Sequence, residues 1–335
     1  IKIAGKSILE WQIENLKRYG VEKIIIIVGY LGYEIKRCFG DGEKLGVSIE
    51  YIEESNPLGS GGSLYFLKEK NIGDDFILIY GDVMFNINWN RMEDFHIQSK
   101  AYATLLVHPN THPFDSDLVA LNSKSQVENF LLKGQKRERW YKNCVNAGVY
   151  ILSKKIVFEM GKLCKLDLEK DILIKYAGKG VLYGYYTTEY VKDAGTVKRF
   201  YEVEKAFLNN IPEKRNLANK QKCIFLDRDG TLNVYKGLLA DEEEFELEEG
   251  TIQALKAINQ SEYLAIVVTN QPVVARGMCE LEDVEKIHRK MTTLLGNEGV
   301  YLDDIIFCPH HPDKGYAEEN VKFKIDCECR KPKTG

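Results

Sequence analysis

The sequence predicts an α/β protein with two domains joined by a polar linker. Its 335 residues are more than one domain of ordinary size needs. Apolar runs of strand length alternate with amphipathic helical stretches, which is typical of a mostly parallel sheet covered by helices. A polar stretch with an internal proline, residues 209–221, interrupts this alternation. We therefore expect one domain at residues 1–208 and a second at residues 222–335.

The elements of the first domain can be assigned in chain order. Ser7 can cap an amphipathic helix that ends at Gly20. Residues 23–28 form a continuous aliphatic strand, residues 47–52 alternate as a half-buried strand does, and residues 75–80 form another buried strand. Because such strands bind ligands at their carboxyl ends, we expect the chemistry of this domain to follow them in the sequence.

The composition argues against several classes of function. The formal net charge is −4, and no basic stripe suggests a nucleic-acid partner. No apolar run approaches the ~18 residues of a membrane span, so we expect no membrane partner. The cysteines outside one cluster are scattered without a pairing pattern, which favours a reducing cytoplasm. The sequence does not indicate an oligomeric state.

Two aspartates stand one residue apart after the apolar residues 223–226. Asp227 and Asp229 would lie at the carboxyl end of that strand, and Gly230 allows a sharp turn there. One carboxylate can attack a phosphorus atom while the other handles a proton. The pattern favours covalent phosphoryl transfer; an ordinary Asp-Gly turn at a strand end is the alternative.

A second constellation lies near the end of the chain. Three of the eight cysteines and two of the six histidines fall within residues 308–329. Thiolates and imidazole are the preferred ligands of zinc, and three cysteines with one histidine make a standard closed structural site. The spacing, C-x-H followed by C-x-C, is not that of a zinc finger. Chance clustering is the alternative explanation.

Three segments of the first domain carry candidate chemistry. The glycine-rich residues 54–62 lead into a helix and would let backbone amides approach a ligand closely. Asp82 ends an apolar strand, where a metal-binding carboxylate is natural, and Asp193 stands just before a helix. Taken singly, each segment could also be a plain turn.

The Asp227-x-Asp229 motif resembles the first signature of the haloacid dehalogenase-type phosphatases. This resemblance implies that Asp227 is the nucleophile, that Asp229 is the general acid/base, and that both help to hold Mg²⁺. It also implies that Thr269 supplies a phosphate-binding hydroxyl and that Lys331 is the third catalytic motif. The acidic fourth motif would lie beyond Gly335, so we expect this domain, as given, to be incomplete and inactive.

The cysteine–histidine cluster directly before Arg330-Lys331 resembles one subgroup of that family. This subgroup comprises the D-glycero-D-manno-heptose 1,7-bisphosphate phosphatases and their histidinol-phosphate phosphatase relatives. The resemblance implies a Zn²⁺ site, and the residues that match its ligands are Cys308, His310, Cys327 and Cys329. His311 is the second choice for the histidine. The long loop between His310 and Cys327 favours the heptose branch.

The same resemblance implies the contacts that the phosphatase makes with its substrate. The matching residues are Asn270, Gln271, Arg276 and Arg330. Pro272 and Val273 depart from the Ser-Gly that the family usually has at these positions. The departure affects the expected shape of the substrate loop but not the phosphate site.

Residues 1 to about 207 resemble the sugar-1-phosphate nucleotidyltransferases. The resemblance implies a mixed sheet, with Asp82 and Asp193 as Mg²⁺ ligands. It implies further substrate contacts from Pro57, Gly59, Gly61, Gly62, Asn146, Gly148, Glu169 and Lys170. The family's G-x-G-T-R nucleotide loop would precede Ile1, so we expect this domain also to be incomplete.

Together the resemblances imply two Rossmann-like α/β domains that carry out consecutive steps toward a nucleotide-activated heptose for surface glycans such as lipopolysaccharide. The phosphatase would act on heptose 1,7-bisphosphate, and the transferase would join heptose 1-phosphate to a nucleoside triphosphate, with GTP favoured. One alternative is a hexose or mannose 1-phosphate transferase fused to a histidinol-phosphatase-like domain. Another is a non-catalytic protein that only binds a nucleotide sugar.

Overall fold

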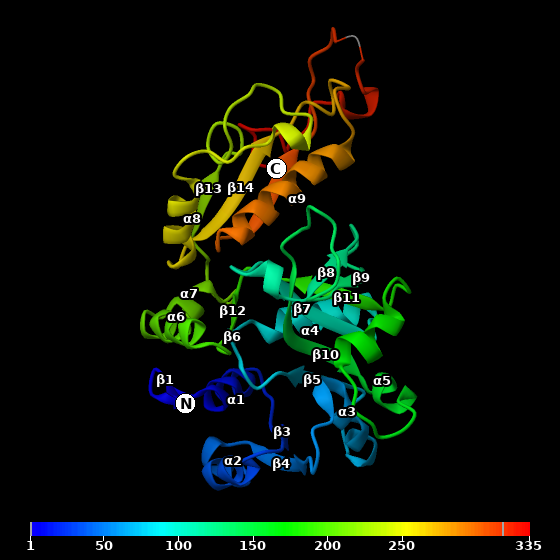
Figure 1. Ribbon diagram of the computed structural model, residues 1–335, viewed down its shortest axis with the longest axis vertical. Helices are drawn as coiled ribbons and strands as arrows, with labels where there is room; N and C mark the ends of the chain where they lie inside the picture. Colours follow the sequence, from blue (N-terminus) through cyan, green and yellow to red (C-terminus); the bar gives the residue numbers. More distant parts are fainter. Residues whose placement is uncertain (1, 317) are drawn as a thin grey trace. The chain divides into compact units, whose positions relative to one another are not determined.

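The computed structural model describes residues 2–316 and 318–335 and divides into two compact units (Figure 1). Unit 1 comprises residues 1–107, 119–132 and 146–219. Unit 2 comprises residues 108–118, 133–145 and 220–335. Two short segments from the first two-thirds of the chain therefore belong to unit 2. The domain limits 1–208 and 222–335, with a linker at 209–221, remain a prediction from the sequence.

The first two-thirds of the chain contain most of the strands. The strands are β1 (Lys2–Ile3), β2 (Lys6–Ser7), β3 (Lys23–Val28), β4 (Ser48–Glu53), β5 (Asp75–Ile79), β6 (Val83–Asn86), β7 (Ala103–His108), β8 (Leu118–Leu121), β9 (Val127–Leu131), β10 (Val145–Ser153), β11 (Leu182–Tyr186) and β12 (Tyr190–Asp193). The α-helices are α1 (Ile8–Arg18), α2 (Gly32–Phe39), α3 (Gly59–Gly62), α4 (Trp89–Ser99), α5 (Lys154–Glu159), α6 (Val197–Leu208) and α7 (Ile211–Arg215). A π-helical turn, Leu168–Ile172, carries the predicted substrate residues Glu169 and Lys170.

The largest sheet is mixed, as the transferase resemblance implies. Its order is β11–β7–β10–β8–β9, and β5 also pairs with β10. β7 and β11 are parallel, whereas β10 runs antiparallel to both β5 and β8. The expectation of a mostly parallel sheet is wrong here, because β8 and β9 follow one another without an intervening helix and antiparallel neighbours need no crossover.

Local sequence sets the elements of unit 1 much as predicted. In the capping box of α1, the Glu10 backbone N–H donates to Ser7 Oγ at 3.2 Å, and the Ser7 N–H donates to the Glu10 carboxylate at 2.6 Å. β3 spans the predicted residues, and β4 and β5 differ from prediction by one residue at their ends. The predicted linker includes α7.

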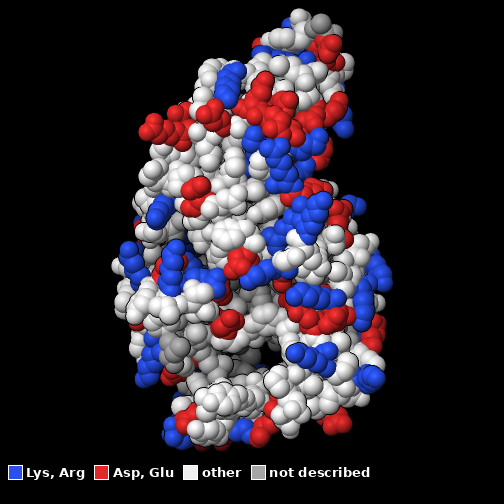
Figure 2. All heavy atoms as spheres, viewed as in Figure 1, with Lys and Arg blue, Asp and Glu red and all other residues white. Residues whose placement is uncertain are grey.

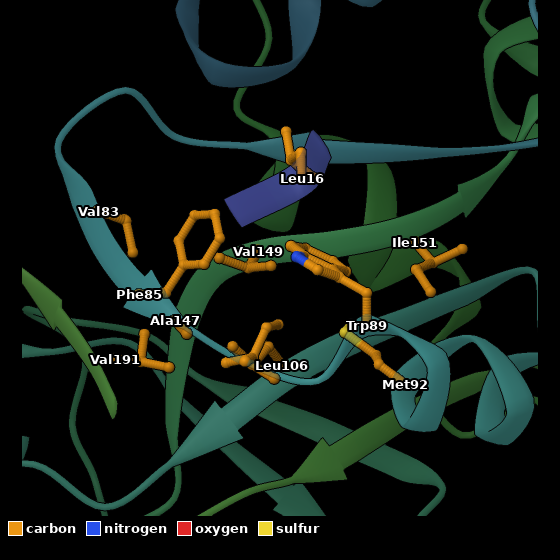
Figure 3. Packing of buried hydrophobic residues seen from close by; sticks show 11 residues of the cluster. Leu16, Val83, Phe85, Trp89, Met92, Leu106, Ala147, Val149, Ile151 and Val191 are labelled. Carbon is orange, nitrogen blue, oxygen red and sulfur yellow. The ribbon is translucent and has the colours of Figure 1, made fainter. Parts of the chain in front are cut away.

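The core of unit 1 gathers around β10 (Figure 3). Val149 of β10, Leu106 of β7 and Met92 of α4 are fully buried. Burial of such a side chain is worth roughly 1.5–3 kcal/mol. β10 is therefore held firmly, and it carries the predicted substrate residues Asn146 and Gly148 near its start.

Unit 2 is built on three parallel strands in the order β13–β14–β15. These strands are β13 (Cys223–Leu226), β14 (Leu264–Asn270) and β15 (Asp304–Cys308). The helices are α8 (Thr251–Asn259) and α9 (Leu281–Asn297). Leu255, Val267 and Met291 pack in the core between the sheet and these helices. Within the described residues β13 pairs on one side only, and Phe225 on it is 66% exposed.

The segments 108–118 and 133–145 pack on α9 within unit 2. The Tyr141 backbone N–H donates to Thr293 Oγ1 at 2.9 Å, and the Thr292 hydroxyl donates to the Tyr141 carbonyl at 3.1 Å. Gly296 leaves room for Pro113, whose Cγ would lie 2.4 Å from an added Cβ. Side chains of α9 therefore fix these segments by hydrogen bonds to the Tyr141 backbone and by close packing.

Both signs of charge occur on the face shown in Figure 2, where patches of Asp and Glu lie beside patches of Lys and Arg. The picture agrees with the near balance of 46 basic and 50 acidic residues. Among residues 2–316 and 318–335, no helix combines the length and the apolar character that a membrane span needs.

Candidate active sites and metal centre

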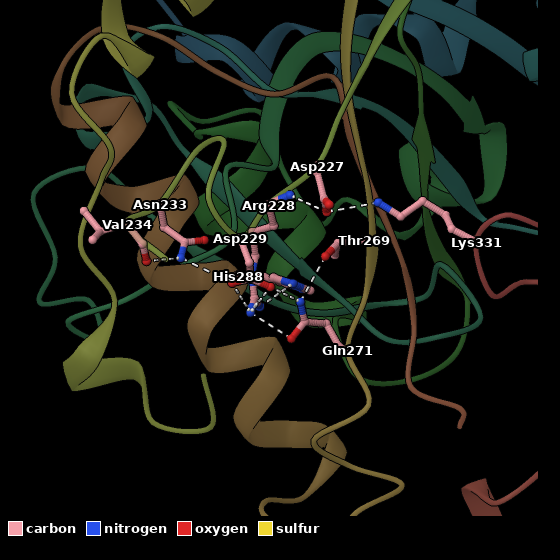
Figure 4. A network of polar contacts seen from close by, with 9 residues as sticks. All are labelled: Asp227, Arg228, Asp229, Asn233, Val234, Thr269, Gln271, His288 and Lys331. Atoms are coloured by element: carbon pink, nitrogen blue, oxygen red, sulfur yellow. Dashed lines mark hydrogen bonds and ion pairs between the residues drawn. The ribbon is translucent and has the colours of Figure 1, made fainter. Parts of the chain in front are cut away.

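The parallel pairing of β13 and β14 brings the predicted phosphatase residues to one sheet edge. Leu226 is in register with Val267, so Asp227 and Thr269 both emerge at the carboxyl ends of these strands. Lys331 reaches this edge from the end of the chain, and its Nζ lies 3.0 Å from Asp227 Oδ1 (Figure 4). A carboxylate, an ammonium and a hydroxyl thus converge where a phosphate could bind.

Lys331 is fixed to the sheet by its backbone as well as by its side chain. Its Nζ donates to the Val268 carbonyl at 2.7 Å. The Lys331 N–H donates to Asn270 Oδ1 at 3.0 Å, and Asn270 Nδ2 donates back to the Lys331 carbonyl at 3.2 Å. Asn270, predicted to contact substrate, therefore has a structural task in holding Lys331.

Asp227 and Asp229 stand in different surroundings. The Asp227 side chain is 49% exposed, whereas both carboxylate oxygens of Asp229 already accept hydrogen bonds. The donors to Asp229 are Arg228, Asn233 and Gln271 (Figure 4). Asp227 is thus the more exposed of the two predicted magnesium ligands, and its contacts with the Arg228 N–H at 2.8 Å and with Lys331 Nζ at 3.0 Å both engage Oδ1. Gln271 is 2% exposed and points its amide into this network rather than outward.

The predicted substrate arginines lie beside the loop that carries the cysteines. The Arg276 guanidinium lies 4.5 Å from the ring centroid of Tyr316, and Arg330 donates to the His310 carbonyl at 3.1 Å. Sequence reasoning missed Lys324, a nearly buried cation 5.0 Å from the same ring. A lysine in a long polar loop carries no signal of such burial. Burial and Arg330 lower the pKa of His311.

The donor atoms of Cys308, His310, Cys327 and Cys329 all lie within 4.8 Å of one another, as predicted. The sulfur of Cys308 is 3.5 Å from that of Cys327 and 3.4 Å from that of Cys329. His310 Nδ1 lies 3.3 Å from the Cys329 sulfur. These separations are close to the edges of a tetrahedron of thiolate and imidazole ligands around one ion. His311 stands apart, since its Nδ1 accepts from the Asp313 N–H.

In unit 1 the two predicted carboxylates meet. A Cβ built at Gly195 would lie 3.3 Å from Asp193 Oδ1 and 3.6 Å from Asp82 Oδ2, so both carboxylates face the same point. The Ala194 N–H donates to the Asp82 carbonyl at 2.9 Å, which ties the two segments together. Arg199 Nε lies 2.8 Å from Asp193 Oδ1. The pair could hold a divalent ion, as carboxylates at strand ends commonly do.

The glycine-rich loop is shaped by its neighbours in the protein. A Cβ on Gly59 or on Gly62 would lie 2.4 Å from a backbone carbonyl oxygen of residues 164–166. A Cβ on Gly61 would lie 2.8 Å from Ile172. Close packing against this segment is thus sufficient reason for the three glycines. Pro57 precedes them in an exposed position.

Glu169 is the one carboxylate among the predicted substrate residues, and it is only 4% exposed. Its Oε1 accepts from Tyr80 at 2.9 Å, from Asn146 at 2.9 Å, and from the Tyr150 hydroxyl. Burial raises the pKa of Glu169 above its ordinary value of 4.5, and the tyrosine hydrogen bonds oppose that rise. Sequence reasoning missed both tyrosines, although Tyr80 directly precedes Gly81-Asp82.

The position of Tyr80 also explains why residue 148 is a glycine. A Cβ at Gly148 would lie 2.7 Å from the Tyr80 ring, and the backbone there has a φ of +71°. Lys170 is exposed, and its Nζ lies 3.7 Å from Asp167 Oδ2. The structure thus brings Asn146, Gly148 and Glu169 together and leaves Lys170 at the surface.

A groove of about 940 Å³ opens between β3 and β5 in unit 1. Its walls are the apolar residues 24–27 and 76–79, and it extends to Ser60 and Asp82. Within the described residues, β3 pairs only with β4, and β5 pairs only with β10.

Carboxylates gathered at strand ends in two α/β units place this chain among α/β proteins that bind ligands at the carboxyl ends of their strands. Residues 1–210 match the Nucleotidyl transferase family, and the chain belongs to this family.

The C-terminal part resembles a different group of proteins. The chain is 40% identical over 115 residues to D-glycero-beta-D-manno-heptose-1,7-bisphosphate 7-phosphatase of Pasteurella multocida. It is 43% identical over 113 residues to the protein of that name in Yersinia pestis. Each match covers 34% of this chain, and the matches cover 60% and 58% of those proteins. The chain thus spans about three fifths of the length of these curated relatives.

Solved structures resemble unit 1 in fold. HddC from Yersinia pseudotuberculosis gives a TM-score of 0.54 at 23% identity, over 62% of this chain and 88% of that protein. HddC complexed with GMP-PN gives a TM-score of 0.53. A putative glucose-1-phosphate thymidylyltransferase from Bacillus anthracis, solved with sucrose, gives 0.54 at 19% identity over 61% and 83% of the two chains. At these identities the likeness concerns the fold, and it confirms the predicted fold class of the transferase part.

The raised pKa of Glu169 predicts how stability depends on pH. The folded state holds the Glu169 proton more tightly than the unfolded state does, so the contribution of Glu169 to stability falls as pH rises above 4.5. Glu169→Gln keeps the acceptor oxygen but cannot ionise, and it should escape this loss. In urea unfolding from pH 4.5 to 8, the stability of the variant relative to wild type should rise with pH. The exposed Glu128→Gln is the control and should follow wild type. If the stability of Glu169→Gln relative to wild type instead fell as pH rose, the ionised Glu169 carboxylate would be stabilising and the prediction would be wrong.

Proposed function

We propose that the chain performs two consecutive steps in the synthesis of a nucleotide-activated heptose. The first is removal of one phosphate from D-glycero-D-manno-heptose 1,7-bisphosphate, and the second is nucleotidyl transfer to heptose 1-phosphate. The observation that carries this proposal is the convergence of Asp227, Thr269 and Lys331 beside the cysteine–histidine cluster. The named 7-phosphatase relatives support the substrate.

In the phosphatase step, Asp227 would attack the phosphorus while the bond from phosphorus to the sugar oxygen breaks. Asp229 would give the departing sugar oxygen the proton that it took from water in the previous turnover. Water would then attack the aspartyl phosphate, Asp229 would take a proton from that water, and inorganic phosphate would leave with Asp227 restored. The Lys331 ammonium, 3.0 Å from Asp227, would offset negative charge in both halves of the reaction.

Thr269 is suited to bind the transferred phosphate. Its Oγ1 accepts a hydrogen bond from Gln271 Nε2 at 2.9 Å, so its own proton is free to be donated to a phosphate oxygen. Mg²⁺ would be held by the Asp227 side chain in this unit and would neutralise phosphate charge. The exposed Asp227 carboxylate fits that role.

In the transferase step, an oxygen of the sugar 1-phosphate would attack the α-phosphorus of the nucleoside triphosphate, and pyrophosphate would leave. The facing carboxylates of Asp82 and Asp193 fit a divalent ion that would bind the triphosphate. The GMP-PN complex of HddC supports GTP as the nucleotide. The sugar contacts of Asn146, Glu169 and Lys170 stay a prediction, as does the cytoplasmic location.

The metal cluster should bind zinc, because three thiolates and one imidazole suit this ion. Purified protein should contain about one zinc per chain by elemental analysis. Cys327→Ser should lose most of it and unfold at a lower temperature. Burial raises the pKa of Cys308 to about 12, so zinc must displace a proton and should bind more weakly as pH falls. The exposed Cys38→Ser serves as control, and equal zinc loss in both variants would refute the site.

The two activities should separate by mutation in protein made from the complete reading frame. Asp227→Asn should lower phosphate release from heptose 1,7-bisphosphate by about 1000-fold or more, because it removes the nucleophile. Asp82→Ala should abolish pyrophosphate release from GTP and heptose 1-phosphate while leaving the phosphatase intact.

Substrate comparison tests the choice of sugar. Faster turnover of histidinol phosphate than of heptose bisphosphate would contradict the heptose assignment, and so would preference for mannose 1-phosphate by the transferase. Loss of both activities in either variant would show that the two sites are not independent.

A further inference from the structure

Arg228, the residue between the two catalytic aspartates, is fully buried. Its guanidinium meets the carboxylate of Asp229 with three short contacts: Nε–Oδ1 at 3.2 Å, Nη2–Oδ1 at 2.9 Å and Nη2–Oδ2 at 3.1 Å. A buried cation is costly unless a counter-charge and hydrogen bonds compensate it. Asp229 is therefore held by a group that itself has no access to water.

The other donors of the guanidinium point at neutral groups. Nη2 donates to Gln271 Oε1 at 2.7 Å, and Nη1 lies 3.5 Å from His288 Nε2 on α9 (Figure 4). Burial, followed by the charge of Arg228, lowers the pKa of His288 to about 3, so the imidazole is neutral. A second carboxylate close to Arg228 is that of Asp227, which is paired with Lys331. Asp229 is thus the carboxylate that faces the guanidinium directly.

Gln271 extends this arrangement to the phosphate site. Because Arg228 can only donate, the Gln271 carbonyl oxygen must face it and the amide NH₂ must point the other way. That Nε2 donates to Asp229 Oδ2 at 2.6 Å and to Thr269 Oγ1 at 2.9 Å. One buried amide therefore links the proposed proton donor to the proposed phosphate-binding hydroxyl.

We propose that Arg228 is a positioning residue for Asp229, and that Gln271 sets the distance between Asp229 and Thr269. The clamp holds the carboxyl group where it can protonate the departing sugar oxygen while Thr269 holds the phosphate. Arg228 itself would not touch the substrate. This inference rests on the proposed phosphatase function.

The proposal is tested by comparing leaving groups in protein from the complete reading frame. A sugar alkoxide needs a proton as it departs, whereas 4-nitrophenolate leaves without one. In Arg228→Met, kcat for heptose 1,7-bisphosphate should fall about 100-fold, and kcat for 4-nitrophenyl phosphate should fall less than about fivefold. Asp229→Asn should show the same pattern. Equal losses on both substrates, or no loss on either, would overturn the proposal.

Further variants separate positioning from folding. Lys290 is a second mostly buried cation; it lies on α9, and its Nζ donates to the Glu242 carbonyl. Lys290→Met should leave the ratio of the two kcat values unchanged. If Arg228→Met does not fold, Arg228→Lys and Gln271→Met take its place. Both variants should lower the ratio of kcat for heptose 1,7-bisphosphate to kcat for 4-nitrophenyl phosphate. An unchanged ratio in both would overturn the proposal. Inactivity of wild type toward both substrates would instead refute the phosphatase function itself.

Discussion

The parallel register of β13, β14 and β15 is the constraint on which the second unit depends. It aligns Leu226 with Val267 and Asn270 with Cys308. The first pairing brings the Asp227 segment to the same edge as Thr269. The second starts the metal-binding loop at that edge, and the loop returns the chain to Lys331. A one-residue slip of β13 would turn its side chains to the opposite faces of the sheet and separate Asp227 from Lys331.

Buried charge is treated differently in the two candidate sites. Arg228 is buried with a carboxylate partner, so its charge is retained and used to fix Asp229. Glu169 is buried among two tyrosines and an asparagine; burial raises its pKa, and the hydrogen bonds from the tyrosines oppose the rise. The candidate phosphatase site therefore keeps a fixed cation beside the carboxyl group of Asp229. The candidate transferase site keeps a buried carboxyl group with a raised pKa.

Much of this could be read from the sequence, because the signals were local. The strand followed by Asp227-x-Asp229, the Ser7 cap, and the C-x-H and C-x-C pairs are each signals of nearby structure, and the structure places them as expected. The direction of β10 could not be read, because strand pairing depends on distant segments. Packing also decided the role of Gly59 and its neighbours, which lie against residues 164–166. The tasks of Arg228 and Gln271 needed coordinates, since burial and amide orientation leave no pattern in the chain.

The central claim is that Asp227 is a nucleophile held at the shared edge of β13 and β14. Mass spectrometry of protein from the complete reading frame, quenched with acid during turnover of heptose 1,7-bisphosphate, tests this most directly. The account predicts one added phosphoryl group on the peptide that contains Asp227, and none in Asp227→Asn. Release of phosphate at the full wild-type rate by Asp227→Asn, or an adduct on another residue, would contradict it.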